Sequence, residues 1–159
     1  MEISWLGHSC LRIRSNDATL ITDPYDQSLG ISMGLQTANI VTFSHEHPHH
    51  SNHSRIEGDP RVLQGPGEYE IGNFYITGVG TDRNNPEGEA TVNTVFSIHA
   101  EGLTLCHLGD LNHTLSSRQI EELGQTDVLF VPAGGVWTIS TSSAAELINL
   151  VAAQIMVPL

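Results

Sequence analysis

The sequence has little positive charge. Its 159 residues contain 6 Lys and Arg against 18 Asp and Glu, which gives a net charge of −12. Proteins that bind nucleic acids need cationic side chains to displace counterions from the phosphates. The composition therefore argues against a nucleic-acid partner, unless bound metal ions supply positive charge locally.

Long apolar runs and cysteines are also scarce. No run approaches the ~20 residues that a membrane-spanning helix needs, and Met1–Trp5 lacks the basic and apolar regions of a signal peptide. We therefore expect a cytoplasmic protein with no membrane association. Only Cys10 and Cys106 are present, both in expected strands. In a cytoplasmic protein such residues are expected to be reduced members of the core.

The length suits a single domain covering residues 1–159. Short apolar runs separated by tight turns dominate the first two thirds of the chain and predict strands. The expected strands are Ile3–Leu6, Cys10–Ile13, Ala18–Thr22, Ile40–Ser44, Arg61–Gln64, Asn73–Val79, Val92–Ile98 and Leu103–Leu108.

The pattern changes in the last third. Ser116–Gly124 has the Ser-to-Gln spacing of a capping box and a terminal glycine, so it predicts a short helix. A second helix is expected over Ser143–Ala153, with buried strands at Asp127–Val131 and Gln154–Val157. This order indicates an α/β protein with mixed sheets and helices on the outer faces. The last strand ends beside Leu159 with no cap or helix after it, which predicts that the domain is truncated at its C-terminus.

Histidines gather in one short segment. Five of the nine lie between positions 45 and 53, directly after an expected buried strand: His45, His47, His49, His50 and His53. Neutral imidazole is the commonest side-chain metal ligand. In extended backbone, residues two apart project to the same side, so His45 and His47 can hold one ion. Pro48 turns the chain and leaves His49 and His50 to reach a neighbouring point. The alternative is a solvated loop, but this density favours a metal site.

A second candidate source of ligands is the strand Leu103–Leu108, which runs into Gly109 and Asp110. Glycine lets the backbone approach other groups closely, and a carboxylate at the end of a strand can bridge two cations. Gly-Asp alone indicates only a turn. Beside the histidine cluster, it predicts that Asp110 belongs to the same site. Gly134–Trp137, which also follows a strand, could form a wall of it.

The sequence motifs resemble those of a known superfamily. The run from His45 to His50 resembles the His-x-His-x-Asp-His signature of the metallo-β-lactamase superfamily. Leu20–Pro24 is similar to its early strand-end aspartate, and His107–Asp110 to its bridging-aspartate motif. Trp5–Ser9 is similar to the opening of the ascorbate-lactonase-like branch of Zn-dependent hydrolases. The order and spacing agree along the whole chain. The resemblance implies an αββα sandwich with the metals at one edge of two sheets.

The resemblance also implies roles for single residues. His45 and His47 would bind the first ion, His50 the second, and Asp110 would bridge them. Asp23 would orient the histidine loop instead of binding metal. His49 stands where the family has an aspartate that binds the second ion and orients the attacking water. We therefore expect His49 and Asp110 to be the catalytic residues, and both to be metal ligands.

The sequence departs from the family pattern at three places. The first is the histidine at position 49. The second is the segment Gly80–Pro86, where a further ligand histidine is expected and none occurs, although Arg83 stands there. The third is the end of the chain at Leu159, before the final ligand histidine of the family. His8 and His107 are candidates to compensate for the missing ligands.

The resemblance implies a metal-dependent hydrolase. Its cofactor would be zinc, as one or two ions, with Mn or Fe as alternatives, and its nucleophile a metal-activated hydroxide. The substrate would be a small molecule of a class that the fold does not specify. The alternative is a catalytically impaired protein of the same fold that serves as a binding or assembly module, which the missing histidines favour.

Overall fold

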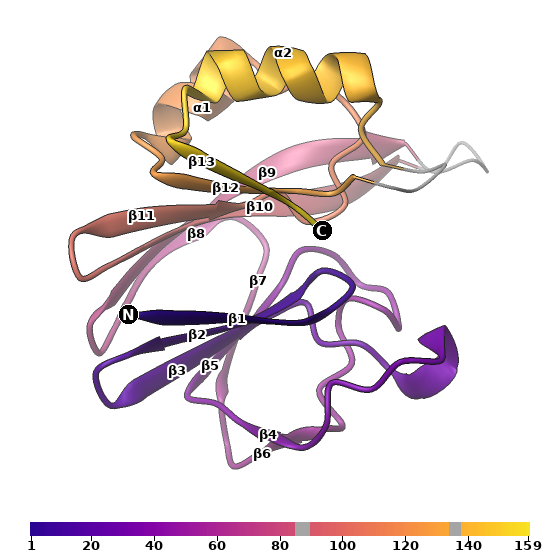
Figure 1. The fold of residues 1–159 in the computed structure, drawn as a ribbon, viewed down its shortest axis with the longest axis vertical. Helices are drawn as coiled ribbons and strands as arrows, with labels where there is room; N and C mark the ends of the chain where they lie inside the picture. The colour runs from indigo at the N-terminus through magenta and orange to yellow at the C-terminus, as the bar shows by residue number, and fades with distance from the viewer. Residues whose placement is uncertain (85–89, 134–137) are drawn as a thin grey trace.

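The computed structural model describes the chain except residues 85–89 and 134–137, and it does not describe the side chains of residues 83, 84 and 90 (Figure 1). Two expectations therefore lie outside the described residues. One is the wall that Gly134–Trp137 was expected to form. The other is the role of the Arg83 side chain as a substitute for a histidine ligand.

The N-terminal half forms a five-stranded mixed sheet with the order β1-β2-β3-β5-β7. Strands β1, β2 and β3 are antiparallel neighbours, whereas β3, β5 and β7 run parallel to one another. The strand bounds are β1 Glu2–Gly7, β2 Cys10–Ser15, β3 Ala18–Thr22, β5 Ile40–Phe43 and β7 Arg61–Gln64. The short 3₁₀ helix η1 (Gln27–Leu29) and the parallel pair β4 (Gln36–Thr37) and β6 (Ile56–Glu57) lie in the connections.

The remaining strands form a six-stranded sheet with the order β13-β12-β11-β10-β9-β8. Strands β8 to β11 are antiparallel, and β11, β12 and β13 are parallel. The bounds are β8 Gly67–Ile71, β9 Phe74–Asn84, β10 Ala90–Ala100, β11 Leu103–His107, β12 Val128–Val131 and β13 Ile155–Pro158. Both sheets are mixed, as expected.

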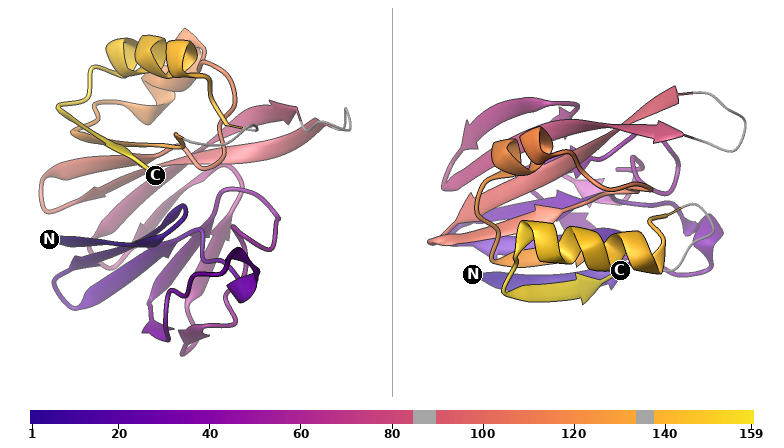
Figure 2. Two further views of the ribbon diagram at one scale, coloured as in Figure 1. Left: turned by 45° about the vertical axis from the view of Figure 1, so that its right-hand side comes forward. Right: turned by 90° about the horizontal axis from the view of Figure 1, so that it is seen from above.

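Alternation along the strands divides the core into layers. Phe96 and Ile98 of β10 are fully buried between the two sheets, where they join residues from both. Val95, on the opposite side of the same strand, packs beneath the helices α1 (Ser117–Leu123) and α2 (Thr141–Val151). Figure 1 and Figure 2 show both helices on the outer face of the six-stranded sheet. Successive side chains of a strand point to opposite faces, so one strand serves both layers.

The outer face of the five-stranded sheet is covered differently. Tyr25, Met33 and Ala38, from the connection between β3 and β5, pack on Val41 and Phe43. Side chains from this largely irregular segment therefore cover the outer face of the five-stranded sheet. Within the described residues, the α-helices therefore cover one outer face only, in contrast to the expectation of helices on both. The complete αββα arrangement stays a prediction.

Local sequence signals located the first helix correctly. Ser116 is its N-cap, with a reciprocal capping box to Gln119, and Gly124 is its C-cap. The second helix begins at Thr141, two residues before the expected start, because Ser140 is the N-cap that accepts from the backbone of Ser143. No helix among the described residues is both long and apolar enough to cross a membrane.

The hairpin of β9 and β10 is longer than the sequence predicts. Its pairing runs from His99 opposite Tyr75 to Ala90 opposite Asn84. The polar end of β9 resembles a loop in the sequence, but cross-strand hydrogen bonds keep it extended. Cys10 and Cys106 are both free and buried, as expected, and they belong to different core clusters.

Candidate metal centre

The histidine segment leaves the sheet where two parallel strands end side by side. Thr22 of β3 is paired with Thr42 of β5, and the backbone N–H of Asp23 donates to the carbonyl of Thr42 at 2.9 Å. The C-terminal ends of parallel strands meet at one edge of a sheet, so the loop after β5 begins next to Asp23. Its backbone turns back on itself where the N–H of His50 donates to the carbonyl of His47 at 2.8 Å.

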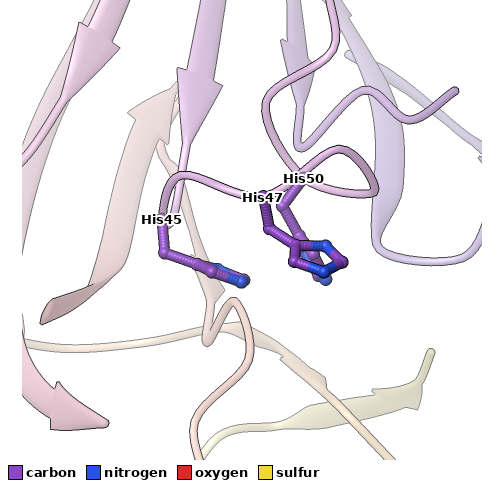
Figure 3. A group of neighbouring side chains, drawn as sticks. All are labelled: His45, His47 and His50. Carbon is purple, nitrogen blue, oxygen red and sulfur yellow. The ribbon is translucent and has the colours of Figure 1, made fainter. Parts of the chain in front are cut away.

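Three of the expected ligands come together in this loop. One nitrogen from each of His45, His47 and His50 lies within 4.8 Å of the others. Figure 3 shows the three rings projecting to the same side of the loop. His45 and His50 are buried, with ring centroids 4.4 Å apart, while His47 is exposed. The group therefore has two fixed imidazoles and one at the surface.

Hydrogen bonds to the outer nitrogens set the tautomers of the two buried rings. The Ser44 hydroxyl donates to Asp23 Oδ2 at 2.6 Å, so its oxygen accepts from His45 Nδ1 at 3.1 Å. His50 Nδ1 donates to the same carboxylate at 2.9 Å. In a neutral imidazole that donates from Nδ1, the lone pair is on Nε2. Both buried rings are thus prepared to bind a cation through Nε2.

Asp23 has no solvent exposure and a left-handed backbone, with φ of 38°. Burial by itself would raise the pKa of its carboxyl. The hydrogen bond from His50, the nearby His107 and the bond from Ser44 outweigh that effect and lower the pKa. Asp23 is therefore a buried carboxylate that holds the histidine loop. It is not a member of the three-histidine group, which agrees with its expected orienting role.

Asp110 approaches the group from the other sheet, at the turn after β11. Its Oδ2 lies 3.9 Å from His45 Nε2. The turn depends on Gly109, whose φ is 61° and where an added Cβ would lie 2.4 Å from Ser44 Cβ. Buried Asn93 fixes the same turn, because its side chain accepts from the Asp110 N–H at 2.9 Å and donates to the Leu108 carbonyl at 3.0 Å. Sequence reasoning missed Asn93, which carries no metal-site motif.

His49 lies outside the three-histidine group. Its Nε2 is 3.0 Å from Ser28 Oγ and 3.9 Å from Asp26 Oδ1, both beside η1. Its backbone N–H donates to His47 Nδ1 at 3.2 Å. The ring is half-buried and only 4.8 Å from that of His47, centroid to centroid. The expectation that His49 binds metal and acts in catalysis stays a prediction.

The two histidines that could compensate for missing ligands are placed differently. His8 Nε2 lies 3.2 Å from His50 Nε2. Burial, and then the charge of His50, lower the pKa of His8. His107 is buried deeper, donates from Nε2 to the carbonyl of Ser9 at 2.9 Å, and has no hydrogen-bond partner for Nδ1 among the described residues. His8 thus contacts the three-histidine group through His50, whereas His107 contacts Ser9 in the protein interior.

The donor set fits a divalent transition metal. Three imidazoles with one nearby carboxylate are typical ligands of zinc and of related ions. A buried carboxylate that orients a ligand histidine is the usual partner of such a site. Two cavities of about 290 Å³ are lined by His45 or by Asp110. One is lined by residues that include Ser44, His45 and Glu46, and the other by residues that include His8, Ser9 and Asp110.

Comparison with known proteins agrees with this fold. Residues 2–159 match the family model described as a β-lactamase superfamily domain. A UPF0173 protein of Pyrococcus abyssi is 24% identical, over 100% of this chain and 82% of the relative. A UPF0173 metal-dependent hydrolase of Lysinibacillus sphaericus is 23% identical, over 100% of this chain and 84% of the relative.

One solved structure is closer in sequence. It is described as a Zn-dependent hydrolase of the metallo-β-lactamase superfamily from Thermotoga maritima, and it is 39% identical with a TM-score of 0.83. The match covers 99% of this chain and 74% of the Thermotoga chain. The chain therefore belongs to the metallo-β-lactamase superfamily, as the histidine segment and the Gly-Asp turn predicted.

Proposed function

We propose that this protein is a metal-dependent hydrolase of small molecules, with zinc as its ion. The observation that carries the proposal is the convergence of His45, His47 and His50 within 4.8 Å. Two of these rings are fixed by Ser44 and Asp23 with Nε2 available as a ligand. The name of the Lysinibacillus relative and the description of the Thermotoga structure support the same activity.

The chemistry follows from the groups around the site. A bound divalent ion would lower the pKa of a water towards ~7 and polarise the oxygen of a scissile carbonyl or phosphoryl group. Asp110 supplies a carboxylate 3.9 Å from His45, which can accept a proton from that water. His49 is the second proposed proton-handling group, next to His47. The cavity of about 290 Å³ lined by His45 and the one of the same volume lined by Asp110 offer space for small-molecule substrates.

Metal analysis tests the proposal directly. We expect protein purified without chelator to carry about one tightly held transition metal, with a second binding more weakly. His47→Ala should remove one ligand of the group and lower the melting temperature in the presence of zinc, because bound ligand stabilises the folded state. His99→Ala is the matched control, since His99 is exposed on β10 and contacts Thr104. Protein that binds no Zn, Mn or Fe would contradict the proposal.

A binding or assembly module is the second candidate. The observation that favours it is His49, whose Nε2 contacts Ser28 instead of joining the three-histidine group. The zinc-loaded protein separates the two candidates when assayed on an activated carboxylic ester and an activated phosphodiester. The hydrolase predicts turnover that disappears in Asp110→Asn. The module predicts bound metal without turnover on either substrate.

A further inference from the structure

We propose that His8 is a ligand of a second metal ion, which it holds together with His50 and Asp110. The inference rests on the proposed function, because the ion belongs to the same centre. It assigns to the turn between β1 and β2 a ligand that lies 42 positions upstream of His50. His8 thereby supplies an imidazole to a site that lacks an aspartate at position 49.

The first support is the distance between the two rings. His8 Nε2 and His50 Nε2 are 3.2 Å apart. Two nitrogens that bind one tetrahedral zinc ion at 2.0–2.1 Å lie about 3.3–3.4 Å from each other. The rings are thus already at the spacing of two ligands on a shared ion.

The second support is the fixed orientation of His50. Its Nδ1 donates to the buried carboxylate of Asp23, which leaves the lone pair of Nε2 directed at His8. Without an ion, His8 Nε2 donates its proton to that lone pair. For both Nε2 atoms to bind one ion, the proton of His8 moves from Nε2 to Nδ1, while His50 keeps the tautomer that Asp23 imposes.

The third support is the position of Asp110. Its carboxylate lies 3.9 Å from His45 Nε2, and the residue lines a cavity together with His8. Asp110 can therefore serve an ion bound by His45 and His47 as well as an ion bound by His8 and His50. A carboxylate between two groups of imidazoles balances the charge of two cations.

The backbone of His8 adds a fourth observation. Its φ is 49°, in the left-handed region that costs a non-glycine residue about 1–3 kcal/mol. Glycine would suit that position better. Trp5 Nε1 donates to the His8 carbonyl at 2.8 Å and helps to hold this conformation. A residue with a strained backbone whose side chain contacts a proposed metal ligand, here His50, is the pattern expected of a functional position.

Calorimetric titration of chelator-stripped protein with Zn²⁺ tests the inference. The wild-type protein should bind two ions. His8→Asn, which tolerates the left-handed backbone, should bind the first ion within about twofold of wild type and the second at least tenfold more weakly. His99→Asn removes an exposed imidazole and should bind both ions like the wild type.

A rescue experiment separates a ligand from a merely structural residue. His8→Gly relieves the backbone and removes the ring, so added imidazole should restore binding of the second ion. No rescue by imidazole in a variant that melts like the wild type without metal would overturn the inference. So would two ions bound with wild-type affinity by His8→Asn. A single ion bound by the wild type would overturn it as well while the proposed function stands, and no bound ion would overturn both.

Discussion

Asp23 and His50 form a buried pair across 27 positions of sequence, with His50 Nδ1 donating to Asp23 Oδ2 at 2.9 Å. The carboxylate stands at the end of β3 and the imidazole in the loop after β5, the neighbouring parallel strand. The contact fixes both the tautomer of His50 and the direction of its Nε2. One acid thereby controls a ligand without binding the ion itself.

Replacing that acid tests its orienting role. In Asp23→Asn, the amide cannot balance the charge of a metal-bound His50, and the ring loses its strongest restraint. We expect metal affinity to fall about 10- to 100-fold, as measured by competition with a fluorescent chelator. Asp59→Asn, on an exposed loop, is the control and should bind metal like the wild type. Equal affinities for the two variants would contradict the role of Asp23.

Gly109 should be intolerant of a side chain. An added Cβ would lie 2.4 Å from Ser44 Cβ and 2.5 Å from Asn93 Oδ1, at a φ of 61°. The strain of the left-handed backbone costs about 1–3 kcal/mol, and the overlap roughly 1–3 kcal/mol more. We therefore expect Gly109→Ala to lose at least about 2 kcal/mol of unfolding free energy in urea, and to bind metal more weakly because Asp110 is displaced.

Gly72 is the matched control for Gly109. Its φ is 62°, but nothing lies within 4 Å of an added Cβ. Gly72→Ala should therefore show the cost of the backbone alone. If both alanine variants lose the same stability, the close approach of the Asp110 turn to Ser44 and Asn93 is not what requires glycine at position 109.

Acid should destabilise the metal-free protein partly through His107. Burial lowers the pKa of this histidine below its ordinary value of 6.5. Between pH 6.5 and the lower folded-state pKa, the unfolded chain binds a proton that the folded chain does not, so stability falls as the pH falls. One such group contributes a slope of at most about 1.4 kcal/mol per pH unit.

The variant His107→Gln isolates this contribution. We expect its unfolding free energy in EDTA to change less between pH 7.5 and pH 5 than that of the wild type. His99→Gln, at an exposed position, should keep the wild-type dependence. A dependence in His107→Gln as steep as in the wild type would assign the acid sensitivity to other groups.

Position 49 should respond to a carboxylate. His49→Asp brings the residue that the superfamily signature has there and removes no member of the three-histidine group. The added negative charge should strengthen binding of a second ion and raise hydrolysis of an activated ester or phosphodiester. Metal titration of the variant beside the wild type measures the first effect. Weaker second-ion binding would mean that imidazole at position 49 is what this centre requires.

Local signals in the sequence determined much of this protein. Alternation of apolar residues located most strands, and the capping pair Ser116 and Gln119 located the first helix. The density of histidines from His45 to His50 predicted a common ligand group, although the backbone at His45 and His47 is bent and not extended as expected. These features depend on neighbours in the chain, so they are visible without a fold.

Other features were decided by contacts between distant segments. Three contacts each join different strands or loops. They are the contact of His8 with His50, the hydrogen bond of Asn93 to the Asp110 turn, and the contact of His49 with Ser28. The sequence also could not show that the connection after β3 covers its sheet with Tyr25 and Met33 instead of a helix. Sheet order and close backbone packing bring these groups together, and neither is encoded in the spacing of adjacent residues.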